Sequence, residues 1–156
     1  EAACTGLHGA NRLGSNSLLE GLVLGQITGQ QAERRKTARH PVIRYQKKYQ
    51  ERIKLNVTDI RNSLRALMWR NAGITRDESR LQKARELIAF WQKYVLDKNF
   101  DHTAGWECQN MLTVSALIIE AALKRRESRG VHFREDFPER DDEHFAHHIE
   151  IQRDCP

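Results

Sequence analysis

The chain has 156 residues, of which 39% are hydrophobic and 30% are charged, with a formal net charge of +5. This length is enough for one domain with a buried core. No apolar run approaches the ~20 residues that a transmembrane helix needs, so no membrane span is expected. Acidic and basic residues are interspersed, as on solvated helix faces, so a nucleic-acid partner is not expected either. Three isolated cysteines form neither a disulfide framework nor a zinc motif, which favours a cytoplasmic protein.

The first twenty residues read as a glycine-punctuated loop that runs into a helix. Glycines at positions 6, 9 and 14 allow positive φ and a close approach of the backbone to a ligand. Ser17 and Glu20 fit the S-x-x-E capping box, in which Ser17 would cap the helix and Glu20 would reach back to the N–H of the cap. Amides at a helix start attract negative charge, and the guanidinium of Arg12 matches a carboxylate. The loop is therefore a candidate ligand site, although capped glycine loops without a ligand are common.

Helical periodicity marks most of the remaining chain. The capped helix is predicted over residues 17–29, and a polar, basic linker follows it. Amphipathic patterns predict three further helices, over residues 58–72, 77–98 and 104–129. None of these can bury its apolar face alone, so we expect them to pack together. No strand pattern follows residue 15, and the predicted fold class is all-α, a three-helix bundle.

The apolar stripes of the bundle helices define a candidate core. Gly73 and Gly130 fit the positions that end the first and third of these helices. The tryptophans at 69, 91 and 106 occupy helical positions, which favours packing in a core or interface over a cofactor contact. The side chains expected to face inward are Ile60, Leu64, Leu67, Met68, Leu81, Ala84, Ile88, Trp91, Val95, Leu112, Ala116, Ile119 and Leu123.

Two polar clusters lie near the C-terminus. The histidines between residues 144 and 148 match no zinc motif, so we expect an exposed tail and assign no metal ligands. Ser128, Arg129 and His132 lack the acid and oxyanion context of a nucleophilic triad. We expect Arg129 and His132 to anchor the end of the bundle to another domain. Finding both of them buried and paired within this chain would count against anchoring.

Two separated motifs resemble one flavoprotein superfamily. Residues 8–13 (HGANRL) and 16–20 (NSLLE) resemble the C-terminal flavin motif of the group that holds succinate dehydrogenase, fumarate reductase and L-aspartate oxidase. Residues 127–138, with ESRGVH followed by DFP, resemble the signature near the end of those chains. Residues 63–74, in which Leu-Met-Trp precedes a Gly-Ile turn, look like the helical domain of L-aspartate oxidase, and residues 109–114 look like its third helix.

This resemblance implies an FAD-dependent enzyme that oxidises L-aspartate to iminoaspartate, with oxygen or fumarate as electron acceptor. Its product would pass to quinolinate synthase in NAD biosynthesis. Carried over position by position, Glu1, Ser17 and Leu18 match residues that bind FAD, and Arg12 matches the arginine that holds a substrate carboxylate. A carboxylate can accept from ribityl hydroxyls, and a helix start favours negative charge on the flavin. No catalytic residue is assigned within this chain.

The resemblance also implies a division of the chain. Residues 1–29 would be a remnant of an FAD-binding domain, 30–56 a basic linker, 57–130 the bundle and 131–156 a tail. No G-x-G-x-x-G motif follows a predicted strand, so the chain looks like a C-terminal piece. Alone, we expect it to be inactive, to hold no FAD and to self-associate through exposed apolar surface.

Two other functions stay open at this point. The chain could be the matching region of a succinate dehydrogenase or fumarate reductase flavoprotein, because the loop and the ESRG segment do not separate these enzymes. It could also be a standalone helical interaction module whose basic linker binds an anionic polymer in a salt-sensitive way.

Overall fold

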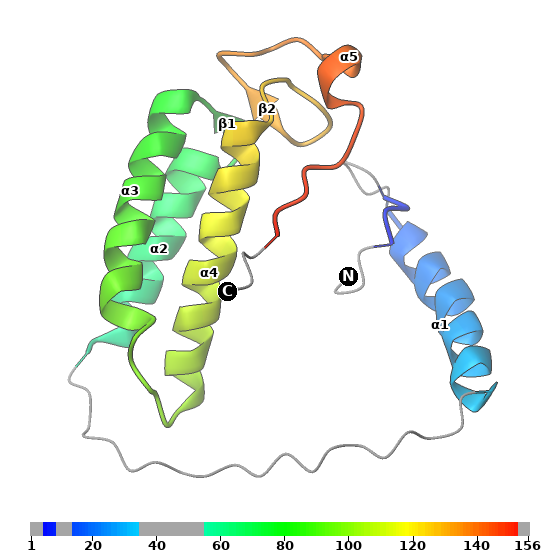
Figure 1. Ribbon diagram of the computed structural model, residues 1–156, viewed down its shortest axis with the longest axis horizontal. Helices are drawn as coiled ribbons and strands as arrows, with labels where there is room; N and C mark the ends of the chain where they lie inside the picture. Colours follow the sequence, from blue (N-terminus) through cyan, green and yellow to red (C-terminus); the bar gives the residue numbers. More distant parts are fainter. Residues whose placement is uncertain (1–4, 9–13, 35–54, 153–156) are drawn as a thin grey trace. The chain divides into compact units, whose positions relative to one another are not determined.

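A computed structural model describes residues 5–8, 14–34 and 55–152 of the chain (Figure 1). The chain divides into two compact units, Glu1–Tyr49 and Gln50–Pro156. Each unit is described by itself. Most of the described residues are helical, which confirms the predicted all-α class.

The first unit contains one long helix, α1, which spans Asn16–Arg34. The helix begins one residue before the predicted start and continues past Gly29, where the sequence suggested an end. A turn with Ser15 in the left-handed region, at φ 67°, precedes it. Apolar side chains along α1 are exposed to solvent, so this helix has no core of its own in the described unit; they are Leu18, Leu19, Leu22, Val23 and Ile27.

The second unit is built on three helices that lie side by side (Figure 1): α2 spans Val57–Ala72, α3 spans Glu78–Val95, and α4 spans Thr103–Lys124. Each begins with a side chain that accepts a hydrogen bond from the amide three residues later. The acceptors are Asn56 Oδ1 at 3.1 Å, Asp77 Oδ1 at 2.8 Å and His102 Nδ1 at 3.1 Å. These caps satisfy amides that have no partner inside the helix, and they place the helix starts close to the predicted positions.

The predicted inward stripes form the observed core. Ile60, Met68, Trp91 and Ala116 are partly buried and pack against it. Gly105 lies directly against the ring of Phe100, where a Cβ would overlap the ring, so this close approach of loop and helix requires glycine. The members of the predicted set that are buried are Leu64, Leu67, Leu81, Ala84, Ile88, Val95, Leu112, Ile119 and Leu123.

Beyond α4 the chain differs from the prediction. The helix ends at Lys124, short of the predicted end at 129, because Arg125 turns into extended backbone with ψ 102°. Gly130 does not end the helix; it lies in the following loop with φ 59°. This loop leads to a two-residue strand that the sequence pattern did not predict.

That strand, β2 (Phe133–Arg134), pairs in parallel with β1 (Thr75–Arg76), which joins α2 to α3. Thr75 lies opposite Phe133. A short helix, α5 (Asp142–Phe145), follows. The pairing brings the segment after α4 to the end of the bundle where α2 ends and α3 begins (Figure 1). None of the described helices is long and apolar enough to cross a membrane.

Candidate functional site

The start of α1 holds two of the predicted flavin contacts, Ser17 and Leu18. The Ser17 side chain is partly buried, whereas that of Leu18 is 74% exposed. The Leu18 amide donates to the carbonyl of Ser15 at 3.1 Å. In the described part of the chain, the amides of Asn16 and Ser17 have no acceptor. The first turn contains no acidic residue, so the positive end of the helix dipole is not neutralised there.

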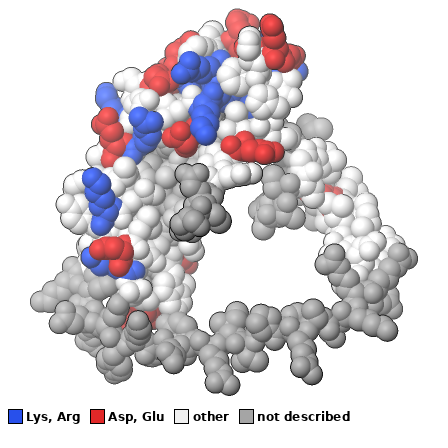
Figure 2. All heavy atoms as spheres, viewed as in Figure 1, with Lys and Arg blue, Asp and Glu red and all other residues white. Residues whose placement is uncertain are grey.

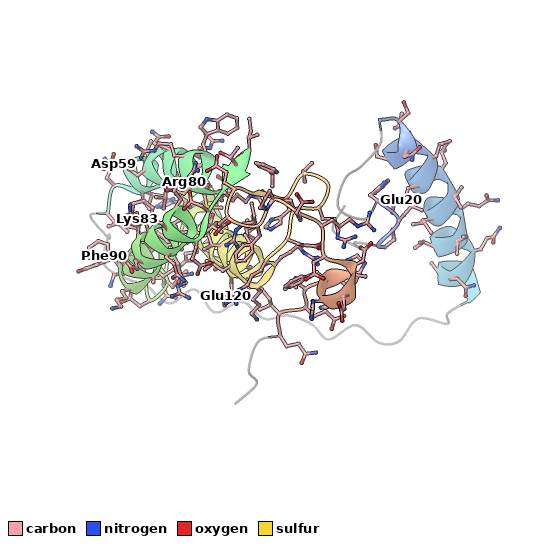
Figure 3. All side chains as sticks on the ribbon, turned by 90° about the horizontal axis from the view of Figure 1, so that it is seen from above. Glu20, Asp59, Arg80, Lys83, Phe90 and Glu120 are labelled. Atoms are coloured by element: carbon pink, nitrogen blue, oxygen red, sulfur yellow. The ribbon has the colours of Figure 1, made fainter. Side chains whose placement is uncertain are left out.

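Glu20 does not form the predicted capping box, because the helix starts ahead of Ser17 and the carboxylate is engaged elsewhere. Glu20 Oε1 accepts a hydrogen bond from the Thr5 hydroxyl. Glu20 Oε2 lies 2.6 Å from His8 Nε2. These two hydrogen bonds hold the pKa of Glu20 below its ordinary value. Figure 3 shows this side chain on α1 beside the preceding loop segment.

A hollow of about 530 Å³ lies next to this contact. Its size is in the range of small-molecule sites, and its lining is mostly apolar, with one ionised carboxylate. The lining residues are Thr5, Leu7, Asn16, Leu19, Glu20, Val23 and Leu24. The two other residues predicted to bind ligand, Glu1 and Arg12, lie outside the residues that the structure describes.

A second polar constellation lies at the end of the bundle, after α4. Glu127 is fully buried there. Its carboxylate accepts from Arg125 at 2.5 Å, from Arg129 at 2.7 and 2.9 Å, and from the Asp141 amide at 2.9 Å. The hydrogen bonds from Arg129 are the largest cause that lowers the pKa of Glu127 to about 2. The buried charge is thus fully paired, as burial requires.

Arg134 is the largest fully buried side chain in the described part of the chain. It donates to the α4 carbonyl of Ala122 at 2.8 Å, to Glu78 at 3.0 Å and to both oxygens of Asp136 at 2.7 Å. Its guanidinium also lies 5.0 Å from the ring centre of Phe137. One side chain therefore joins the end of α4, the start of α3 and the loop after β2.

His132 and Arg129 are both paired within this unit, which counts against the predicted anchoring role, although only His132 is buried and Arg129 is partly exposed. His132 is buried; its Nδ1 accepts from Arg76 at 2.8 Å, and its Nε2 lies 3.1 Å from the Arg125 carbonyl. Burial is the main cause that lowers the pKa of His132. Arg129 pairs with Glu127 and with Asp142 at 2.6 Å. Both side chains are thus occupied within this unit and serve to close it, because the charge network folds the loop back onto the bundle.

Figure 2 shows acidic and basic side chains interspersed over this end of the second unit. The histidines at 144, 147 and 148 are exposed, as expected. No cluster within the described residues could hold a metal ion. The three tryptophans differ in exposure: Trp91 packs on the core, Trp106 is 47% exposed and donates to the Phe100 carbonyl at 2.7 Å, and Trp69 is 71% exposed. Packing in the core is thus wrong for Trp69, whereas packing in an interface stays a prediction. Periodicity alone did not show that Trp69 faces away from the core.

Comparison with known proteins links both ends of the chain to one family. Residues 61–155 match the family described as fumarate reductase flavoprotein C-term. The fumarate reductase flavoprotein subunit of Mycobacterium tuberculosis H37Rv is 38% identical over 99% of this chain and 31% of its own length. Chloroplastic L-aspartate oxidase of Arabidopsis thaliana is 34% identical over 88% of this chain and 25% of its own length. L-aspartate oxidase 1 of Ralstonia nicotianae is 37% identical over 89% and 28%.

Among solved structures, the Mycobacterium smegmatis Sdh1 complex in the apo form matches with a TM-score of 0.66 and 28% identity, over 87% of this chain and 26% of that one. The chain thus spans less than a third of the length of the relatives it matches. The family match over residues 61–155 covers most of the bundle and the charge network that closes it. The chain therefore belongs to the succinate dehydrogenase and fumarate reductase flavoprotein family, of which it carries the C-terminal helical region.

Proposed function

We propose that the chain is the C-terminal region of an FAD-dependent L-aspartate oxidase, which converts L-aspartate to iminoaspartate with oxygen or fumarate as electron acceptor. The observation that carries this choice is the exposure of Trp69 and Ile74, at 71% and 75%. Both belong to the stretch that resembles aspartate oxidases, and the packing of the bundle requires neither of them. The stability of a three-helix bundle therefore does not explain why these exposed residues resemble those of aspartate oxidases, and we attribute the likeness to a shared function.

The chemistry at the start of α1 is compatible with FAD. Among the described residues the amides of Asn16 and Ser17 have no acceptor, the dipole of a long helix favours negative charge, and the neighbouring hollow is mostly apolar. Bound FAD would supply the hydride acceptor, while the protein would bind and orient the reactants. In this proposal Ser17 and Leu18 contact the flavin through the helix start. The Leu18 amide, which donates to the Ser15 carbonyl, would either donate to the flavin as well or give up the Ser15 carbonyl for the flavin.

Glu1 and Arg12 complete the proposed site on chemical grounds. The Glu1 carboxylate would accept hydrogen bonds from FAD hydroxyls. The planar guanidinium of Arg12 would hold a substrate carboxylate through two parallel hydrogen bonds. Loss of hydride from the substrate Cα and of a proton from its amine yields the imine. We place the enzyme in the cytoplasm, with quinolinate synthase as the consumer of iminoaspartate.

The decisive experiment uses the complete open reading frame that contains this chain. The purified holoenzyme is mixed with L-aspartate or with succinate under anaerobic conditions, and bleaching of the flavin absorbance is followed. We expect rapid bleaching with L-aspartate, and ammonia release as the imine hydrolyses. Bleaching by succinate alone would refute the aspartate proposal. The chain of residues 1–156 by itself should purify without flavin absorbance.

A fumarate reductase or succinate dehydrogenase flavoprotein is the second candidate. It is favoured by the 38% identity to the M. tuberculosis fumarate reductase flavoprotein subunit over nearly the whole chain, and by the likeness to the Sdh1 structure. The same experiment separates the two candidates, because only this one predicts bleaching of the flavin by succinate without release of ammonia.

A further inference from the structure

One side of α3 is apolar and faces away from the core. Leu87, Phe90 and Tyr94 are 44%, 52% and 54% exposed, although the same helix buries Leu81 and Ile88 in the core. The ring centres of Phe90 and Tyr94 lie 4.9 Å apart, so these two side chains form one continuous surface. The three exposed residues recur at spacings of three and four and therefore form a stripe along the helix, the α3 stripe. Stripes with this spacing pair with other helices.

Oppositely charged side chains lie at the two ends of the α3 stripe, at equal distances from its centre. Lys83 lies seven residues before Phe90, and Asp97 lies seven residues after it, just past Leu96, which keeps helical backbone angles. Figure 3 labels Lys83 and Phe90 along this helix. The Asp97 side chain contacts the adjacent Lys98 at 2.7 Å but is still 59% exposed, so it has room for a second cation. Lys83 and Asp97 are roughly 20 Å apart along one chain, too far to pair with each other.

This order of charges suits a second copy of the chain that runs in the opposite direction. A two-fold axis at Phe90 would bring the two Phe90 rings together and would place Leu87 of each copy beside Tyr94 of the other. The same axis would place Lys83 of each copy opposite Asp97 of the other, which forms two ion pairs. A parallel pair would instead place Lys83 opposite Lys83 and Asp97 opposite Asp97. Attraction between opposite charges therefore favours the antiparallel arrangement.

A second set of charges on α3 agrees with the antiparallel arrangement. Glu86 and Lys93 are exposed and lie seven residues apart, on the same flank of the α3 stripe. In an antiparallel two-fold pair each flank meets the same flank of the other copy. An axis at Phe90 would therefore bring Glu86 of each copy within one residue of the level of Lys93 in the other. Charges beside an apolar stripe set the orientation of paired helices.

We propose that the α3 stripe docks a second copy of this chain, in an antiparallel two-fold pair centred on Phe90. The surface is self-complementary in its apolar residues and in its charges, as a two-fold interface requires. The inference does not depend on which reaction the complete enzyme catalyses. One helix face is smaller than the ~800 Å² per partner of a standard interface, so we expect a reversible pair with a Kd on the order of 10 µM.

The first test follows the dimerisation of the chain of residues 1–156 by sedimentation equilibrium, from about 1 to about 500 µM. Phe90→Glu places two carboxylates together at the axis and should weaken the pairing about 100-fold. Circular dichroism checks that this exposed substitution leaves the helices intact. The matched controls are Val114→Glu on α4 and Leu22→Glu on α1, at positions 52% and 71% exposed, and both should keep the wild-type Kd. A monomeric wild type, or a dimer that a control variant dissociates and Phe90→Glu does not, overturns the proposal.

The second test exchanges the charges at the ends of the α3 stripe. Lys83→Glu would face Asp97 of the other copy and should weaken the pairing about tenfold, and adding Asp97→Lys should restore it to within about threefold. Because the two residues are too far apart to interact within one chain, restoration requires contact between copies. Lys83→Glu combined with Glu143→Lys, at an exposed position of α5, restores the net charge alone and should stay weak. Equal restoration by both double variants, or by neither, overturns the antiparallel arrangement.

The third test uses the complete protein that contains this chain. We expect its wild type to dimerise and Phe90→Glu to make it monomeric. A complete protein that is monomeric at every concentration overturns the proposal, because another of its segments would then cover α3. Bleaching of the flavin by L-aspartate is measured on the same samples. This second readout tests the proposed function separately, since the α3 stripe touches neither substrate nor cofactor in that proposal.

Discussion

The two units of this chain treat their apolar side chains in opposite ways. In the second unit the leucines of α2, α3 and α4 face one another, and the core residues Leu64, Leu81 and Leu112 are at most 1% exposed. In the first unit Leu18 and Leu22 of α1 are more than 70% exposed. A bundle that buries its own stripes holds itself together, whereas a single amphipathic helix depends on surface supplied by other parts of a protein.

The largest test of this difference removes the buried cation that closes the second unit. Arg134→Ala removes the guanidinium that donates to Glu78, to Asp136 and to the Ala122 carbonyl. We expect it to lower the free energy of unfolding by about 4 kcal/mol, because it removes several hydrogen bonds from a charged donor and leaves a cavity where the fully buried side chain lay. Urea unfolding followed by tryptophan fluorescence measures this, because all three tryptophans lie in the second unit.

The matched control is Arg140→Ala. Arg140 is 63% exposed, and within the part of the chain that the structure describes it pairs only with the exposed Asp142. The loss should be below about 1 kcal/mol, as for exposed ion pairs. Equal effects of the two substitutions would show that burial does not set the strength of this network.

The next largest effect compares two leucines directly. Leu81→Ala opens a cavity in the core, because Leu81 is fully buried, and should cost about 3 kcal/mol. Leu22→Ala changes an exposed side chain on α1 and should alter the stability by less than about 0.5 kcal/mol. Thermal unfolding followed by circular dichroism separates the two. A large loss in Leu22→Ala would mean that α1 is covered in the isolated chain.

A smaller effect appears in how the free energy of unfolding depends on pH below about 4.5. The pKa of Glu127 is about 2 in the folded chain against an ordinary value of 4.5, so the unfolded state binds more protons between these values. The free energy of unfolding therefore falls as the pH drops from about 4.5 to about 2. Urea unfolding across this range should show a shallower fall for Glu127→Gln, although this variant is less stable at neutral pH. Glu143→Gln, at an exposed position, should keep the wild-type slope.

The smallest effect concerns His132. Burial and the nearby Arg76 lower its pKa from the ordinary 6.5, so the fold favours the neutral ring. Stability contributed by this ring is present above about pH 6.5 and declines as the pH falls below it. His132→Gln should cost about 1 kcal/mol at neutral pH and should flatten the curve just below pH 6.5. His148→Gln, at an exposed position with no partner among the described residues, serves as the matched control.

The bundle could be predicted from the sequence because its determinants repeat locally. Leucine and isoleucine recur at helical spacing, and this pattern alone predicts the three helices. The caps Asn56 and Asp77, which the structure shows at two helix starts, agree with it. The parallel pair β1–β2 could not be predicted, since two residues per strand show no period and their partners are distant in sequence. The early end of α4 has a similar origin: Arg125 and Glu127 suit a helix locally, but Arg125 donates to the His147 carbonyl and Glu127 accepts from the Asp141 amide, both in the segment that folds back.

At the start of α1 the sequence predicted a helix start correctly but predicted the wrong hydrogen-bond partners for Glu20. Ser17 and Glu20 fit a capping box by spacing, yet the helix begins at Asn16 and Glu20 turns to Thr5 and His8. Local spacing does not distinguish a carboxylate that reaches its own helix start from one that reaches an earlier loop. The roles of Ser17 and Leu18 at the flavin remain predictions from the resemblance.

The pairing of β1 with β2 has a consequence for the order of folding. In the sequence Thr75 comes before α3 and Phe133 comes after α4. Their pairing therefore closes a long loop, unless α3 and α4 have already packed together and shortened it. Formation of α3 and α4 should thus precede the strand pairing, and the arginine network should form last. Substitutions at Arg134 are then expected to speed unfolding with little effect on the rate of folding, whereas substitutions at the α3–α4 contact slow folding itself.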